Sequence, residues 1–300
     1  MENNLFKSRS IYGCVKAAFN LMNLNILKIF KKTWMPAIAL AVIFTLYILG
    51  CKNVMFANLC GQKLSYWILL AFVLIVICET LAESWLMSRT YTLLNTNSFK
   101  NNLRRSLSVT LLKLFVAIVI FTIAFFCGGT AIAILVSKHL YSPEKAVSIS
   151  MIIEFAIITI GFIFTLPFIF STTKYIMEKN TEVINIFSKD YHTGIKHLGF
   201  ILIGQIITTL CYILIMLVIA LPLMIIFHAY LTNQMGIMNG DSDGTPSYFI
   251  FLMVSVSLLT TFLYTYIFVY FYIFSYYIYG AITQQEKEKA DIKMKIDKYE

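Results

Sequence analysis

Six long apolar runs are the feature that most constrains this chain. They extend over about residues 34–50, 65–87, 108–136, 147–170, 199–227 and 248–279. A helix rises 1.5 Å per residue, so about 20 apolar residues cross the roughly 30 Å hydrocarbon layer of a bilayer. Hydrophobic residues make up 59% of the chain and charged residues 13%, whereas soluble proteins average about 45–50% and about 25%. We therefore expect an all-α, multi-pass transmembrane protein with six helices.

Lysine and arginine are unevenly distributed between the connections. With the N-terminus taken as cytoplasmic, 20 of the 24 Lys and Arg residues fall on the cytoplasmic side and four in outer loops. Cytoplasmic loops of membrane proteins carry such an excess. We therefore expect both termini in the cytoplasm. The same placement accounts for the net charge of +9, so nucleic acid is not an expected partner.

The apolar runs divide the chain into three parts. Residues 1–33 form a cytoplasmic amphipathic segment, 34–280 the six-helix transmembrane domain, and 281–300 a charged cytoplasmic tail. Apolar side chains recur at helical spacing between 11 and 30. This predicts a helix that either lies on the membrane surface or packs as a solvated amphipathic helix on its own protein.

The spans are expected to pair as three hairpins. Each odd-numbered span follows a polar, partly amphipathic inner segment that ends in two basic or titratable residues, Lys31-Lys32, Arg104-Arg105 and Lys196-His197. Residue identity between these units is poor. Either a structural repeat or the shared layout of hairpins explains the pattern.

Polar residues inside the runs are the candidate chemistry, because a charge close to hydrocarbon is costly. Glu79 and Glu83 lie four residues apart on one face of the second span. Glu83 is expected at the inner interface, and Glu79 about 9 Å deep. Lys113 and Gln205 are expected at similar depths, about 7 and 9 Å, in the third and fifth spans. These positions predict an intramembrane polar layer of Glu79, Lys113 and Gln205.

The role of this layer is open at the level of sequence. Glu79 and Lys113 could pair, since their spans are consecutive and antiparallel. Alternatively, Lys113 extends to the interface and Glu79 is protonated or bonded to a hydroxyl. The layer could also hold a substrate or proton, or act as a structural clamp.

Other polar residues are weaker candidates. Glu154 lies about 10 Å deep in the opposite leaflet, where a lone carboxylate is more often a helix-packing group. Arg104, Arg105 and Lys196 are candidate contacts for anionic lipid head groups, although the positive-inside rule alone explains them. Four tyrosines fall where an inner aromatic belt is expected, Tyr272, Tyr276, Tyr277 and Tyr279.

The cysteines and histidines do not show metal-ligand spacing, so we expect neither a metal nor a cofactor. Cys51 and Cys60 share a predicted outer loop and could form a disulfide, but sequence does not determine the geometry. The other cysteines inside apolar runs are expected to be buried, Cys78, Cys127 and Cys211. Motifs of nucleophilic catalysis are not visible, which argues against an enzyme.

A resemblance extends over the hydrophobic layout. The segment Ile186–Gly194 followed by Gly199, together with six spans and short outer loops, resembles uncharacterised bacterial six-helix membrane proteins. These include the membrane domain attached to some glycerophosphodiester phosphodiesterases. The resemblance implies a bacterial cytoplasmic membrane, but no functional residue is carried over, and phosphodiesterase activity is not expected.

Together these features predict an integral membrane protein that is non-catalytic and interacts with lipids or with a membrane-protein partner. The alternative is a small transporter or channel that uses the inner-leaflet layer of Glu79, Lys113 and Gln205.

Overall fold

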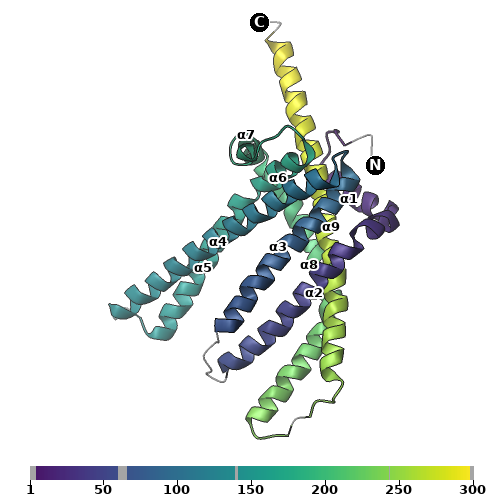
Figure 1. Cartoon of the computed structure of the whole chain (residues 1–300). Helices are drawn as coiled ribbons and strands as arrows, with labels where there is room; N and C mark the ends of the chain where they lie inside the picture. The colour runs from purple at the N-terminus through teal and green to yellow at the C-terminus, as the bar shows by residue number, and fades with distance from the viewer. Residues whose placement is uncertain (1–4, 60–65, 139–140, 243, 298–300) are drawn as a thin grey trace.

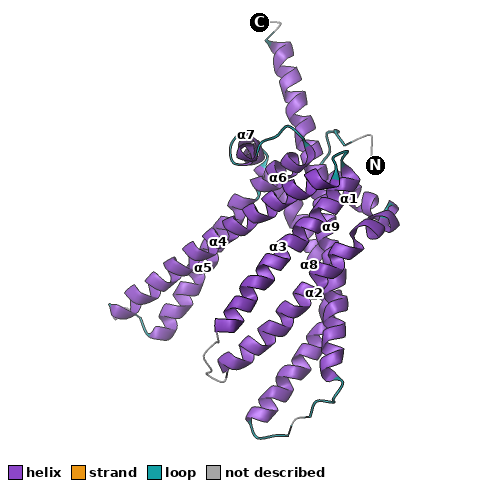
Figure 2. Ribbon diagram, in the orientation of Figure 1, coloured by secondary structure: helices purple, strands orange, loops and turns teal. Residues whose placement is uncertain are grey.

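The computed structural model describes residues 5–59, 66–138, 141–242 and 244–297, and within these ranges every element is helical (Figure 1, Figure 2). The long helices are α2 (Ile26–Leu59), α3 (Tyr66–Leu94), α4 (Phe99–Ser137), α5 (Pro143–Thr165), α8 (Leu198–Met238) and α9 (Phe249–Ile296). The short ones are α1 (Ile11–Leu24), α6 (Pro167–Met177), the 3-10 turn η1 (Val183–Ile186) and α7 (Lys189–Lys196).

Within the described residues, six helical stretches are long and apolar enough to cross a membrane. The fourth combines α5 and α6 over Glu144–Met177, and the others lie within α2, α3, α4, α8 and α9. The prediction of an all-α transmembrane protein is confirmed. The helices run beyond the apolar runs: α9 has 48 residues, which corresponds to about 72 Å at 1.5 Å per residue. Its charged end therefore projects well past a hydrocarbon layer.

The buried core lies at one end of the molecule. We call this end the basal layer and define it as α1, α6, η1, α7 and residues Val269–Ile282 of α9. Figure 1 shows the pairs α2/α3, α4/α5 and α8/α9 spreading outward from this layer, while the N-terminal end of the chain lies beside it and the C-terminal end of α9 projects beyond it, away from the arms. Residues Tyr276–Ile282 of α9 are continuously buried there.

Outside the basal layer the helices expose apolar side chains. Phe121, Phe155 and Leu214 are each more than half exposed. In water this surface would be highly unfavourable, whereas lipid tails are as apolar as the side chains themselves. The two-part arrangement, with a packed base and apolar outer arms, is consistent with a protein whose arms are solvated by lipid.

The basal tyrosines do not form an aromatic belt, so that prediction is wrong. Tyr272, Tyr276, Tyr277 and Tyr279 are all at most 5% exposed. The hydroxyl of Tyr279 donates to Glu178 Oε1 at 2.8 Å. A tyrosine can be buried when its hydroxyl finds a partner, and for Tyr279 that partner is the C-cap residue of α6.

The α1 helix packs one face against α8 and α9. Cys14, Ala18 and Leu21 are buried on that face, and burial raises the pKa of the Cys14 thiol to about 11. Tyr12 and Phe19 remain exposed on the opposite side. The helix thus serves as part of the base and still presents aromatic side chains outward.

A break between α5 and α6 turns the chain into the basal layer. Pro167 begins α6, where its missing N–H costs little because first-turn N–H groups have no helical partner. The α7 helix packs on α6 at Gly194, where an added Cβ would lie 2.7 Å from the carbonyl oxygen of Pro167. Lys174 on α6 donates to Asp190 Oδ1 on α7 at 2.7 Å, and this links the two helices further.

Two cysteine predictions have different outcomes. Cys78, Cys127 and Cys211 are exposed on the outward arms, so the expectation of burial is wrong. Because those arms are apolar, a small apolar residue needs no protein cover there. Cys60 is not among the described residues, and its pairing with Cys51 therefore lies outside what the structure describes.

Candidate functional site

A cavity of about 420 Å³ lies between the basal layer and the outward arms. Ligand pockets in proteins typically measure about 300–1,000 Å³. Its walls come from the end of α3, the first half of α4, the end of α5, α6, and single turns of α8 and α9. It is therefore formed by all three pairs of long helices together with the short basal helix.

The cavity is partly open, and its opening faces the apolar outside. Phe121 of α4 and Phe162 of α5 line the cavity, and they are also 59% and 54% exposed on the surface of the arms. Because these side chains border both spaces, a molecule in the surrounding lipid could enter between the arms without crossing the basal layer.

The lining changes in character from the basal end outward. On α4, Leu112 and Lys113 are the lining residues nearest the base, and Val116, Ile120 and Phe121 follow them outward. Phe121 is eight residues from Lys113, a rise of about 12 Å. On α5, apolar Ile158 lies outward and Thr165 lies near the base. The polar lining groups thus lie toward the base, beside apolar residues such as Met87, Leu166 and Ile169, and the wall toward the middle of the bundle is apolar.

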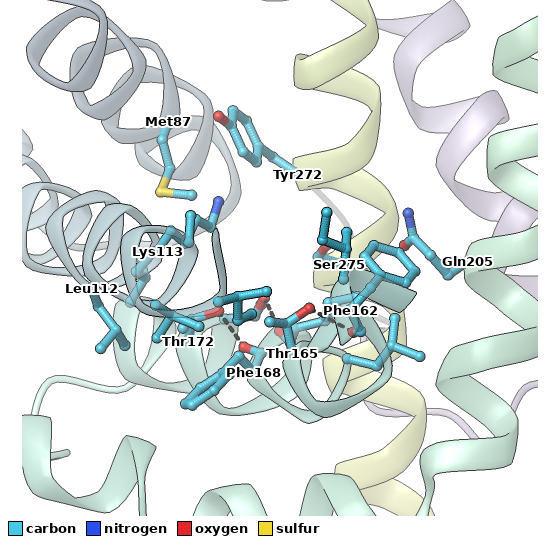
Figure 3. Close-up of a pocket in the computed structure, with 18 of the residues that line it drawn as sticks. Met87, Leu112, Lys113, Phe162, Thr165, Phe168, Thr172, Gln205, Tyr272 and Ser275 are labelled. Atoms are coloured by element: carbon cyan, nitrogen blue, oxygen red, sulfur yellow. Dashed lines mark hydrogen bonds between the residues drawn. The ribbon is translucent and has the colours of Figure 1, made fainter. Parts of the chain in front are cut away.

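Figure 3 shows how the polar groups surround the space. Lys113 approaches from α4 on one side, Tyr272 and Ser275 from α9 and Gln205 from α8 on the other, and Thr165 and Thr172 from α5 and α6. Each of these two threonines donates its hydroxyl to a carbonyl of the preceding turn, Phe162 O and Phe168 O. Their oxygens can still accept a hydrogen bond from a ligand.

Lys113 belongs to a polar group with Glu83 and Tyr272. Its Nζ lies 3.4 Å from Glu83 Oε1, and the Lys113 and Glu83 side chains are 47% and 29% exposed. The Tyr272 hydroxyl donates to the same Glu83 oxygen at 3.0 Å. The Lys113 ammonium lies 5.7 Å from the centre of the Tyr272 ring. Three helices, α3, α4 and α9, therefore meet through one carboxylate oxygen.

Glu79 does not pair with Lys113, so this alternative for the polar layer is wrong. Lys113 pairs with Glu83, one turn nearer the base, and among the described side chains no ion pair joins it to Glu79. Equal depth along two helices does not fix which faces are opposed, and Tyr272 of α9 holds Glu83 in place. Glu79 is half-buried on α3 and does not line the cavity.

The third member of the predicted layer does reach the cavity. Gln205 lines it from α8, opposite Lys113. Its Nε2 donates to Thr209 Oγ1 at 3.4 Å, which is a long bond. The carboxamide therefore keeps further capacity to donate and accept. Two of the three predicted residues are thus brought together around one space.

Glu154 lies apart from this site and packs within the α4/α5 pair. Its carboxylate occupies the space beside Gly128, where an added Cβ would lie 2.0 Å from Oε1. Ser150 donates to the same oxygen at 3.0 Å. Glycine at 128 is required for this close approach, and Glu154 acts as a packing group there.

The three candidate head-group contacts have different environments. Arg104 and Lys196 are exposed at the basal end. Arg105 is only 9% exposed, and its guanidinium donates to the carbonyls of Tyr175, Glu178 and Lys179 at the end of α6. Those carbonyls have no helical partner of their own. Arg105 is therefore committed to capping α6, and its assignment as a head-group contact is wrong.

Several lining residues escaped the reasoning from sequence. The sequence places Tyr272 in an aromatic belt, and it gives no prediction for Tyr91 and Thr173. These two share a hydrogen bond of 3.3 Å between their hydroxyl oxygens. The run Ser171-Thr172-Thr173 soon after Pro167 is the available signal, because clustered hydroxyls late in an apolar run need partners.

Within the described ranges, His, Cys, Asp and Glu side chains do not form a group of three or more that could hold a metal ion. Comparisons of this chain with protein-family models, with curated proteins and with solved structures found no match. The fold by itself defines the class: this is an integral membrane protein, with six candidate membrane-spanning helices in the part of the chain that the structure describes.

Proposed function

We propose that this protein is a non-catalytic, lipid-binding protein of a bacterial cytoplasmic membrane, with its basal layer on the cytoplasmic side. The main observation in support is the distribution of polar groups in the cavity. They lie toward the base, and the wall toward the middle of the bundle is apolar. A lipid of the basal leaflet has the same polarity, with its head group at the interface and its acyl chain directed inward. The concentration of Lys and Arg at the basal end supports the orientation.

The opening supports the same function. A lipid diffuses within the leaflet, so a cavity bordered by exposed Phe121 and Phe162 can receive it sideways. The bound acyl chain would exchange contacts with other lipids for contacts with Val116, Ile120 and Ile158. Because both environments are apolar, the selectivity must come from the polar groups at the basal end.

Transport is the less supported alternative. Lys113 and Gln205 line one cavity, as a polar transport layer would require. Glu79 does not contribute to its lining, and the wall becomes apolar outward, which does not favour passage of a polar solute. The geometry therefore supports binding of an amphiphile more than conduction.

The proposal is tested by filling the cavity. Ala117 lines the space from α4, and Ala133 is exposed on the same helix outside it. The protein would be purified in mild detergent, and retained lipids would be measured by native mass spectrometry. We expect Ala117→Trp to reduce retained lipid about tenfold or more and Ala133→Trp to leave it unchanged. Equal retention in the two variants would contradict the proposal.

A further inference from the structure

The charge of the cavity carries an inference that rests on the proposed function. Among the described residues that line the cavity, Lys113 alone carries a formal charge. The partner of its ammonium, Glu83, is not part of the lining. A ligand therefore meets the positive member of this ion pair, while the negative member lies behind it.

The Lys113 ammonium has donors to spare. A lysine carries three N–H donors, and among the described residues Lys113 forms one ion pair, at 3.4 Å. Charge-assisted bonds between nitrogen and oxygen are typically about 2.7–2.9 Å, so the existing pair is loose. The side chain is also 47% exposed. A second anionic oxygen can thus bind Lys113 without displacement of Glu83.

Glu83 and Tyr272 set the position of that ammonium. Glu83 Oε1 accepts from Tyr272 at 3.0 Å as well as from Lys113. Tyr272 is buried in the basal core, so the carboxylate is tied to α9. The carboxylate orients Lys113, but its own negative charge also opposes an incoming anion.

We propose that the cavity selects amphiphiles with an anionic oxygen group in the head, a phosphate or a carboxylate, and that Lys113 binds this group directly. Glu83 is a positioning residue that weakens the affinity through its charge. Across the cavity, Gln205 is placed to receive uncharged oxygens of the same head group. The acyl chain lies along Val116, Ile120 and Phe121.

Opposite charge effects make the proposal testable. In Glu83→Gln the carboxamide oxygen can still accept from Tyr272 and Lys113, but the opposing charge is removed. In Lys113→Gln the anionic head group loses the ammonium that would bind it. In Lys113→Arg the charge is kept. The control is Lys100→Gln, which removes an exposed lysine from the same helix outside the cavity.

Delipidated protein would be titrated with phosphatidic acid, phosphatidylglycerol, oleate and diacylglycerol, and binding followed by native mass spectrometry. We expect Lys113→Gln to weaken binding of the anionic probes about tenfold, and to change diacylglycerol binding less than about twofold. Glu83→Gln should tighten binding of the anionic probes. Lys113→Arg and Lys100→Gln should bind like the wild type. Elution as a monodisperse peak verifies that each variant is folded.

The outcomes separate this inference from the proposed function. The inference is overturned if the wild-type protein binds all four probes with equal affinity, or if Lys100→Gln loses as much affinity for the anionic probes as Lys113→Gln does. In either case the proposed lipid binding is not contradicted. The inference is also overturned if Glu83→Gln weakens binding as Lys113→Gln does, because the pair would then act only as a structural unit. If Lys113→Gln weakens binding of the two phosphate probes but not of oleate, the group bound is a phosphate. If it weakens binding of oleate only, the group bound is a carboxylate. If no probe binds, the proposed function itself fails.

Discussion

At the scale of single residues, the helix face that a side chain occupies decides its role more than its depth does. Glu79 and Glu83 are separated by one helical turn on α3, yet Glu83 meets Lys113 and Tyr272 while Glu79 does not reach the cavity. The same holds for two neighbouring arginines, since Arg105 is buried under α6 and Arg104 is exposed. Adjacent or near-adjacent residues of one type therefore carry different functions.

The pairing of Lys113 can be tested by double-mutant cycles. We expect Glu83→Gln and Lys113→Gln to be non-additive, with a coupling of about 0.5–1 kcal/mol, since the pair is partly exposed. The matched cycle with Glu79→Gln and Lys113→Gln should be additive. Unfolding in detergent micelles, followed by loss of helical circular dichroism, supplies the four free energies of each cycle. Coupling in the Glu79 cycle with none in the Glu83 cycle would reverse the assignment.

At the scale of helices, α6 depends on contacts that other elements supply. It begins at Pro167 and ends at Met177, and the carbonyls of Tyr175 within it and of Glu178 and Lys179 just after it accept from Arg105 of α4. Its other contacts include Gly194 of α7 and the Lys174–Asp190 ion pair. An 11-residue helix is too short to be stable alone in water, so these contacts hold the basal wall of the cavity in place.

Removal of the Arg105 side chain should therefore destabilise the base. We expect Arg105→Met to lower the free energy of unfolding by about 2 kcal/mol or more, because buried carbonyls lose a charged donor. Arg104→Met should change it by less than about 0.5 kcal/mol, as for other exposed substitutions. Denaturant unfolding of the two variants in the same detergent supplies the comparison. Equal stability would show that the α6 carbonyls are satisfied without Arg105.

At the scale of the whole molecule, packing and solvation divide the protein in two. The base is packed through buried residues of several helices, among them Tyr277 and Ile278 of α9. The arms expose apolar side chains to what must be lipid. Only where the arms diverge from the base can a cavity with one polar and one apolar end form, and the candidate site lies at this junction.

This arrangement predicts the position of both ends of the chain. The first described residue lies beside the basal layer, and the last lies at the tip of α9, which projects from this layer away from the arms (Figure 1), so reporters fused to either end should lie on one side of the membrane. We expect green fluorescent protein to fluoresce at both ends and alkaline phosphatase to be inactive there. Alkaline phosphatase inserted after Gly240, at the outer end of α8, should be active. Reporters that place the two ends on opposite sides would contradict an even number of spans.

The sequence by itself determined the class of protein, because the length and apolarity of a helix that crosses a bilayer are local properties. It also identified Lys113 and Gln205 as unusual, since any polar residue inside an apolar run is costly. It could not determine that Glu83, and not Glu79, meets Lys113. Nor could it show that Arg105 caps α6, or that Tyr272 is buried in the core and not at an interface. Those outcomes depend on which faces of distant helices are opposed, and only tertiary packing decides that.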